Sequence, residues 1–102
     1  MLPEEFMDFL RLCEKKMADG EKKYGVFNPR ADTRVFGFEG IKEVADASNY
    51  MDLGVERFRQ DHMLRMFAFA VKSRLIEIYP ILRRFEEREK ELLSLRDKSS
   101  KS

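Results

Sequence analysis

Residues 62–79, with the sequence HMLRMFAFAVKSRLIEIY, form the richest apolar segment of the chain. Apolar side chains recur in it at helical spacing, and in its first half they fall on nearly every side of the predicted helix. Such a helix must be covered on every side, and two partner helices from a chain of 102 residues can hardly do this. The segment therefore predicts a helix that packs against another subunit as well as against its own chain.

The same helix is predicted to continue to about residue 96. Pro80 removes a backbone donor and clashes with the preceding turn, so we expect a bend near it. Charged residues alternate in sign between positions 83 and 91, and ion pairs such as Glu86–Lys90 support such a helix. We expect this charged run to be a solvated face and residues 97–102 to be a frayed polar tail.

Two further helices are predicted before this segment. Residues 3–24 begin with Pro3 near the first helical position and carry apolar residues at helical spacing. Residues 25–37 contain an Asn28-Pro29 turn and predict an ordered loop. Residues 38–60 are the second predicted helix. It carries a broad apolar face that we expect to be core, formed by Ile41, Val44, Met51, Val55 and Phe58. Asp61 follows it and can cap the last helix.

The predicted fold is therefore all-α, a three-helix chain with a kinked last helix that forms a helical bundle completed by oligomerisation. A chain of 102 residues allows one domain, which we place at residues 1–96 ahead of the tail. Symmetric helix packing closes equally well as a homodimer or a homotetramer, so the sequence leaves this choice open.

The composition is that of a folded, water-soluble chain. Hydrophobic residues make up 43% and charged residues 38%, which is too apolar for disorder and too charged for a membrane span. The formal net charge of +1 is not the excess of positive charge that is typical of nucleic-acid-binding proteins. The chain starts without the pattern of a signal peptide, and Cys13 is its single cysteine, so we expect a cytoplasmic protein without an internal disulfide.

Three carboxylates on the second predicted helix are the strongest candidates for chemistry. Glu39, Glu43 and Asp46 are spaced i, i+4, i+7, which places them within roughly 60° of one another around the helix. Hard divalent cations such as Mg²⁺ prefer oxygen ligands, and carboxylates clustered on a rigid helix can hold one. The alternative is an ordinary solvated face opposite the apolar one. Tyr50 continues the acidic face and Asn49 stands beside it, which favours a groove between helices.

Several stretches resemble short MazG-like proteins of the all-α nucleotide pyrophosphohydrolase superfamily. They are EKKYGVFNP at residues 21–29, DTR at residues 32–34 and EGIKEVADASNY at residues 39–50. The resemblance implies a dimeric helical bundle that binds Mg²⁺ and assists attack of water on a nucleoside triphosphate. Glu43 and Asp46 match the Glu-x-x-Asp motif of that superfamily. Lys42 stands where many relatives have a second glutamate, and a Glu-Glu-x-x-Glu motif is absent.

The resemblance also gives a role to cations around the predicted loop, because they can neutralise triphosphate charge while Phe27, Phe36 or Tyr24 contacts a base. The alternative is that Phe27 and Phe36 pack the loop against the bundle and the cations are solvated. Together with the two polar residues beside the acidic face, the candidate substrate-binding residues are Lys22, Lys23, Arg30, Arg34, Asn49 and Tyr50.

Two functions of different classes follow from these patterns. The first is a homo-oligomeric MazG-like nucleotide-binding protein that holds Mg²⁺ on Glu39, Glu43 and Asp46. Such a protein could also be a pyrophosphohydrolase, although the sequence does not identify a catalytic residue. The second is a non-enzymatic interaction protein in which the apolar third helix builds an oligomer or binds a partner helix. The degenerate acidic motif favours the second. A nucleic-acid module ranks last, because acidic residues alternate with the cations.

Overall fold

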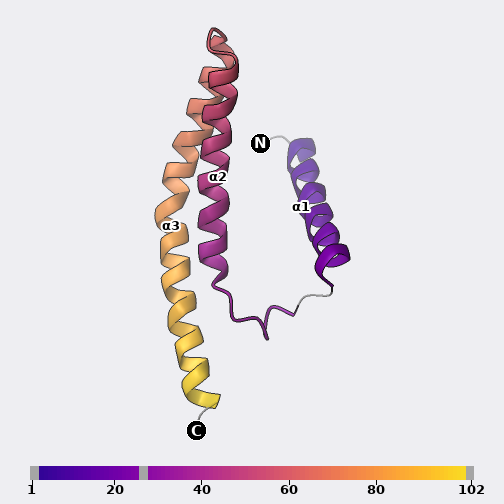
Figure 1. Ribbon diagram of the computed structural model, residues 1–102, viewed down its shortest axis with the longest axis vertical. Coiled ribbons are helices and arrows are strands. Elements are labelled where there is room, and N and C mark those ends of the chain that lie inside the picture. Colours follow the sequence, from indigo (N-terminus) through magenta and orange to yellow (C-terminus); the bar gives the residue numbers. More distant parts are fainter. Residues whose placement is uncertain (1–2, 26–27, 101–102) are drawn as a thin grey trace. The chain divides into compact units, whose positions relative to one another are not determined.

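The computed structural model describes residues 3–25 and 28–100, without the side chains of residues 99 and 100. These residues form three helices and their connections, namely α1 at Pro3–Tyr24, α2 at Phe36–Arg57 and α3 at His62–Ser100 (Figure 1). The described part contains no strand, so the all-α prediction is confirmed. The chain divides into two compact units, residues 1–32 and residues 33–102, and each is described by itself.

The first unit contains α1. Pro3 occupies the first helical position, where its missing N–H costs no hydrogen bond, and two glutamates in the first turn favour the positive end of the helix dipole. The helix ends at Tyr24 because Gly25 adopts a φ of 88°, in the left-handed region that favours glycine. The Gly25 N–H donates to the carbonyl of Glu21 over 2.8 Å, which satisfies one of the last carbonyls of α1.

The chain turns sharply after α1, as the Asn28-Pro29 pair predicts. The N–H groups of Ala31 and Asp32 both donate to the Asn28 carbonyl, each over 3.2 Å. Phe27, one of the three candidate contacts to a base, lies outside the described residues.

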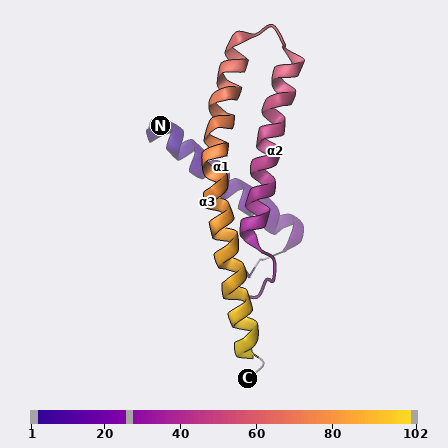
Figure 2. The same ribbon diagram turned by 90° about the vertical axis from the view of Figure 1, so that its left-hand side faces the viewer.

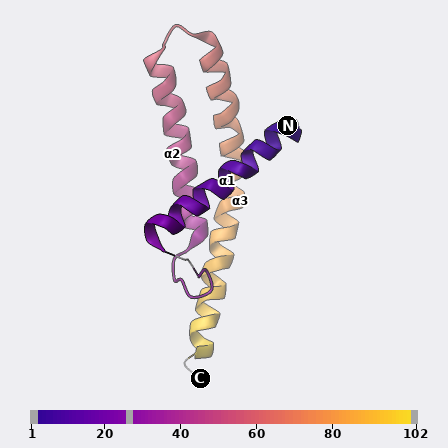
Figure 3. The same cartoon turned by 90° about the vertical axis from the view of Figure 1, so that its right-hand side faces the viewer.

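The second unit is an antiparallel hairpin of α2 and α3, which lie side by side in all three views (Figure 1, Figure 2 and Figure 3). The Asp61 carboxylate accepts a hydrogen bond from the N–H of Leu64 over 2.9 Å, which confirms Asp61 as the cap of α3. At about 1.5 Å per residue, the 39 residues of α3 span roughly 58 Å and the 22 residues of α2 roughly 33 Å. The C-terminal part of α3 therefore extends past the start of α2.

The helix bounds differ from the prediction at three places. α2 begins at Phe36, before the predicted start at residue 38, and α3 continues through Pro80 to Ser100, past the predicted end at residue 96. The bend near Pro80 stays a prediction, and residues 101 and 102 of the predicted tail lie outside the described residues. α2 stops at Arg57, and Phe58 is wrong as a core residue because the chain turns there and leaves its side chain 57% exposed.

The two helices of the hairpin approach most closely at the start of α2. Gly37 is buried, and a Cβ atom placed on it would lie 2.8 Å from both the Cα and the N atom of Glu86. Only glycine permits this approach of one backbone to the other. Farther along α2, four of the predicted core residues are half-buried: Ile41, Val44, Met51 and Val55.

α2 covers one side of α3, and large apolar side chains remain exposed on the other sides. Within the described part, Ala68 is the one apolar residue that is buried. The hairpin by itself therefore has little apolar core, and its completion by another subunit stays a prediction. Seven large apolar side chains of α3 are between 56% and 75% exposed: Met63, Met66, Phe67, Phe69, Ile76, Ile81 and Phe85.

Replacing Gly37 by alanine tests the close approach of the two helices. The added methyl group must displace the backbone of Glu86, so we expect the free energy of unfolding to fall by about 1–3 kcal/mol although alanine is the better helix former. Gly54→Ala is the matched control, because a Cβ there meets nothing within 4 Å. Its unfolding free energy should rise by up to about 1 kcal/mol. Urea unfolding followed by circular dichroism measures both changes, and equal effects would contradict the close contact.

Candidate functional site

The acidic edge of α2 consists of Glu39, Glu43 and Asp46 and lies outside the contact with α3. Glu43 and Asp46 are exposed. Glu39 is half-buried, and its carboxylate lies 2.8 Å from the ammonium group of Lys42. Lys42 also lies over the ring of Phe38, 5.0 Å from the ring centroid. The helix thus keeps the three carboxylates along one edge, with Glu39 already paired to a cation.

This acidic edge does not form a metal site by itself. Within residues 3–25 and 28–100, no three side chains of His, Cys, Asp or Glu are grouped closely enough to hold a metal ion. Mg²⁺ prefers carboxylate, phosphate and water oxygens in octahedral coordination, so the donor chemistry of Glu43 and Asp46 fits it. Further oxygen ligands must come from another source to complete such a site.

Two candidate substrate-binding residues follow the acidic edge along α2. Tyr50 lies about one turn beyond Asp46 and is 67% exposed. Asn49 precedes it and is also exposed. An accessible phenol and an accessible amide beside carboxylates can hydrogen-bond to a ligand or, in the case of Tyr50, stack on a planar ring.

Three of the candidate cations belong to the first unit. Lys22 and Lys23 lie in the last turn of α1, and the Lys23 ammonium group is 5.3 Å from the centroid of the Tyr24 ring. Arg30 lies in the turn after α1, where its backbone N–H donates to the side-chain oxygen of Asn28 over 3.1 Å. These cations flank the segment that joins α1 to the second unit.

Arg34 belongs to the second unit and directly precedes α2. Its guanidinium group lies 5.8 Å from the centroid of the Phe36 ring. Within this unit the structure therefore gathers Arg34 near the first turn of α2 and the acidic edge on the turns that follow. The candidate substrate-binding residues are divided between the two units.

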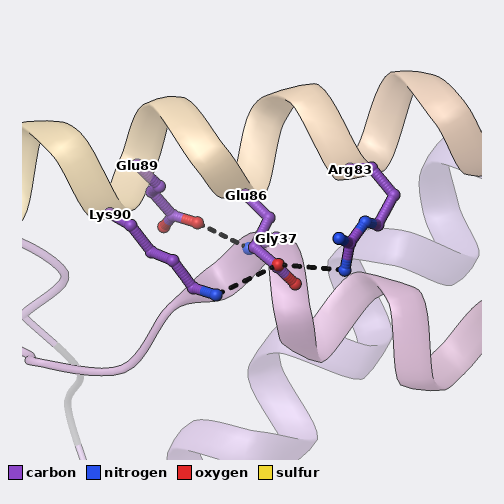
Figure 4. A network of polar contacts seen from close by, with 5 residues as sticks. All are labelled: Gly37, Arg83, Glu86, Glu89 and Lys90. Carbon is purple, nitrogen blue, oxygen red and sulfur yellow. Dashed lines mark hydrogen bonds and ion pairs between the residues drawn. The ribbon is translucent and has the colours of Figure 1, made fainter.

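The start of α2 is held by a side chain of α3 that the sequence pattern did not single out (Figure 4). The Glu89 carboxylate accepts hydrogen bonds from the N–H groups of Phe36 and Gly37, over 2.9 Å and 2.6 Å. Figure 4 shows the bond from Gly37. Val35, the N-cap residue of α2, makes no side-chain cap, so these N–H groups depend on an acceptor from elsewhere. A carboxylate there also stabilises the positive end of the helix dipole. Glu89 thereby fixes where α2 and its acidic edge begin.

Glu86 lies one turn before this cap and is only 2% exposed. One of its carboxylate oxygens accepts from Arg83 over 3.4 Å and from Lys90 over 3.2 Å, which confirms the predicted Glu86–Lys90 ion pair (Figure 4). Its other oxygen is buried without a hydrogen-bond partner among the described residues. The expected solvated face is therefore wrong for Glu86 and Glu89, because α3 passes the start of α2 at these residues.

An open apolar groove runs along one side of the hairpin. Beside it, the ammonium group of Lys72 lies 2.6 Å from the carboxylate of Asp52, an ion pair that joins α3 to α2. The groove suits an apolar side chain and offers few polar groups for chemistry. Its volume is about 250 Å³, and its lining consists of Ile41, Val44, Ala45, Ser48, Lys72, Leu75, Ile76 and Tyr79.

Comparisons with protein-family models, curated proteins and solved structures find no match to this chain. Among the described residues, no helix combines the length and the hydropathy that crossing a bilayer requires. Two features of the described part can carry a function, namely the acidic edge of α2 and the exposed apolar surface of α3.

Glu89→Ala tests whether α3 caps α2. Both N–H groups at the start of α2 lose a charged acceptor, so we expect the free energy of unfolding to fall by about 1–3 kcal/mol. Glu87→Ala is the control, because Glu87 is exposed on the same helix, and its effect should stay within about 0.5 kcal/mol. Urea unfolding gives the free energies, and amide hydrogen exchange of Phe36 and Gly37 shows whether the helix start opens. A loss no larger for Glu89→Ala than for Glu87→Ala would argue against the cap.

Proposed function

We propose that this chain is a MazG-like nucleotide-binding protein that works as a homo-oligomer and binds a nucleoside triphosphate through Mg²⁺. The observation that carries the proposal is the acidic edge of α2, where Glu39, Glu43 and Asp46 follow one another along an uninterrupted helix. A helix keeps the spacing of its carboxylates before a metal binds, so less conformational entropy is lost when the ligands assemble. A cytoplasmic location, where nucleoside triphosphates and Mg²⁺ are present, goes with this proposal.

Glu43 and Asp46 are the proposed principal metal ligands because they match the Glu-x-x-Asp motif and are exposed. Glu39 is the third, and its ion pair with Lys42 must loosen for it to contribute. Bound Mg²⁺ supplies charge neutralisation of the phosphates and acidification of a water molecule. A carboxylate that does not bind the metal can accept the proton of that water, which makes pyrophosphate hydrolysis the corresponding reaction.

The remaining candidates contact the substrate in this proposal. The cations neutralise phosphate oxygens, and the side chains that follow the acidic edge on α2 hold the rest of the nucleotide. These residues are Lys22, Lys23, Arg30, Arg34, Asn49 and Tyr50.

A second copy of the chain is part of the proposal for two reasons. Within the described residues the acidic edge has too few grouped ligands for a metal ion, so another set of oxygens must be supplied. The hairpin also leaves large apolar side chains of α3 exposed, and covering them stabilises the assembly. A homodimer or a homotetramer meets both requirements.

The second candidate function is a non-enzymatic helical interaction protein. It is favoured by the pairing of Glu39 with Lys42, which weakens the acidic edge as a ligand set, and by the extent of exposed apolar surface on α3. In this case the acidic edge is a solvated face and α3 is the functional surface.

A nucleotide screen with Mg²⁺ separates the two functions. We expect Mg²⁺-dependent thermal stabilisation by at least one nucleoside triphosphate, and Glu43→Gln should abolish it because the neutral amide is a poor Mg²⁺ ligand. If pyrophosphate is released, the same substitution should slow its release by about 100-fold or more. Glu56→Gln is the control, since Glu56 is exposed near the far end of α2 and outside the acidic edge. The absence of any stabilisation or turnover would favour the interaction protein.

A further inference from the structure

A second apolar stripe runs along α3, separate from the side that packs on α2. Its first set of residues recurs every seven positions: Leu64, Val71, Ile78, Phe85 and Leu92. A second set follows each of these by three positions: Phe67, Arg74, Ile81, Arg88 and Leu95. We call these residues the outer seam. A seven-residue repeat sustained from residue 64 to residue 95 is typical of a helix that packs along another helix as a coiled coil.

The outer seam is open, whereas the neighbouring stripe of α3 is covered by α2. Ala68, on the covered stripe, is 7% exposed. Phe67 immediately before it belongs to the seam and is 56% exposed. Ile81 and Phe85 in the middle of the seam are 65% and 57% exposed, and Leu95 near its end is 53% exposed. α3 therefore has two packing stripes, and the hairpin uses one of them.

The two arginines of the outer seam each form an ion pair with a glutamate of their own helix. Arg74 pairs with Glu77 over 3.2 Å, and Arg88 pairs with Glu91 over 3.0 Å. Both pairs have i,i+3 spacing, and they recur two heptads apart. The aliphatic stems of these arginines can pack among the apolar residues of the seam while their charged ends remain solvated.

The area of the outer seam matches what a stable dimer needs. An aromatic side chain presents about 150–250 Å², so Phe67 and Phe85 each leave roughly 100 Å² uncovered. Eight exposed apolar residues and two arginine stems together supply an area on the order of the ~800 Å² that each partner contributes to a standard interface.

We propose that the outer seam pairs with the same seam of a second copy of this chain, and that the two α3 helices run antiparallel. A parallel pair would place Arg74 against Arg74 of the partner subunit in the middle of the seam, and like charges there disfavour it. The antiparallel pair that sets Ile78 against Ile81 of the partner subunit instead places Arg74 against the partner's Phe85. Cations are attracted to aromatic faces, so this arrangement is favourable.

The same register brings opposite charges together beside the seam. Counting outward from the pair of Ile78 and Ile81, Glu77 is level with residue 82 of the partner subunit. Arg84 of the partner subunit is two residues, or about 3 Å along the helix axis, from that level, and the symmetry repeats this proximity on the other side. Leu64 and Leu95 meet at the two ends, so the whole seam is covered. The pairing gives the homo-oligomer of the proposed function a surface and a register. It needs neither metal nor nucleotide, so it can hold even if the chain binds no nucleotide.

Two isoleucines on α3 provide a matched test of the surface. Ile81 is in the seam and 65% exposed, and Ile76 is outside it and 71% exposed. By analytical ultracentrifugation of the full chain, we expect the wild type to have twice the 12.1 kDa mass of one chain. Ile81→Glu should raise the dissociation constant at least about tenfold, and Ile76→Glu should leave it within about twofold. A monomeric wild type, or equal effects of both substitutions, would overturn the proposal.

This comparison is valid only if both variants fold. Far-ultraviolet circular dichroism of the same samples measures their helix content. If Ile81→Glu loses helix, Leu92→Glu takes its place. Leu92 lies past the Glu89 cap, so a charge there does not disturb the packing of α3 on α2. Leu92→Glu should weaken the dimer while the helix content is unchanged, and an unweakened dimer would refute the seam.

Disulfide trapping tests the orientation. In a Cys13→Ser background, Phe67→Cys and Leu92→Cys are each oxidised alone and then as an equimolar mixture. The antiparallel register places residue 67 against residue 92 of the partner subunit, so we expect a cross-linked heterodimer in the mixture and little cross-linking of either variant alone. Cross-linking of Phe67→Cys alone at a comparable yield would show a parallel pair and overturn the proposed orientation.

Discussion

The contact of Gly37 with the backbone of Glu86 sets the register of the whole hairpin. A side chain larger than hydrogen at position 37 would push the helices apart, and Gly40 extends the close approach, with its Cβ position 3.6 Å from the Leu82 side chain. A carboxylate cap from the next turn of α3 then fixes the first residues of α2. In this register Glu43 lies level with about residue 80 of α3, since the antiparallel helices advance at the same rate per residue. The position of the acidic edge is thus a consequence of one glycine contact.

The energetics of the hairpin favour further burial of the apolar side chains of α3. Burying Glu86 with one unpartnered oxygen costs about 1–3 kcal/mol, which the contacts of Arg83 and Lys90 with its other oxygen offset only in part. Ala68 is the single buried apolar residue of the described part, so the hairpin has little apolar burial to set against that cost. Covering one large apolar side chain contributes about 1.5–3 kcal/mol, so the packing of a few exposed residues of α3 exceeds the cost of Glu86.

The parts of this structure that local chemistry determines were predictable from the sequence. Helical spacing located the three helices, Asp61 was recognised as a cap, and i, i+4, i+7 spacing placed the three carboxylates on one edge. The role of Glu89 was hidden, because its partners lie more than 50 positions away and an alternating charge run is ordinarily solvated. Val35 and Gly37 are the residues from which this cap could have been predicted. A helix that starts without a polar N-cap and with a glycine in its first turn needs an acceptor from another element. The source of the further ligands that the proposed metal site requires was not predictable, because the proposal places them on a second copy of the chain.

The proposed pairing of α3 and the proposed metal site meet at Glu43. The apolar groove occupies one side of the hairpin, and Glu43 lies two residues, or about 200°, from both Ile41 and Ala45 in its lining. On α3, Ile78 of the seam lies two residues, or about 200° around the helix, from Ile76 in the lining of the groove. Glu43 and the seam are therefore both on the side of the hairpin opposite the groove. An antiparallel pair centred between Ile78 and Ile81 has its two-fold axis level with residue 80, and therefore level with Glu43 in both copies. The two Glu43 carboxylates would then approach each other beside the axis, so that the dimer contributes the oxygen ligands that one chain lacks.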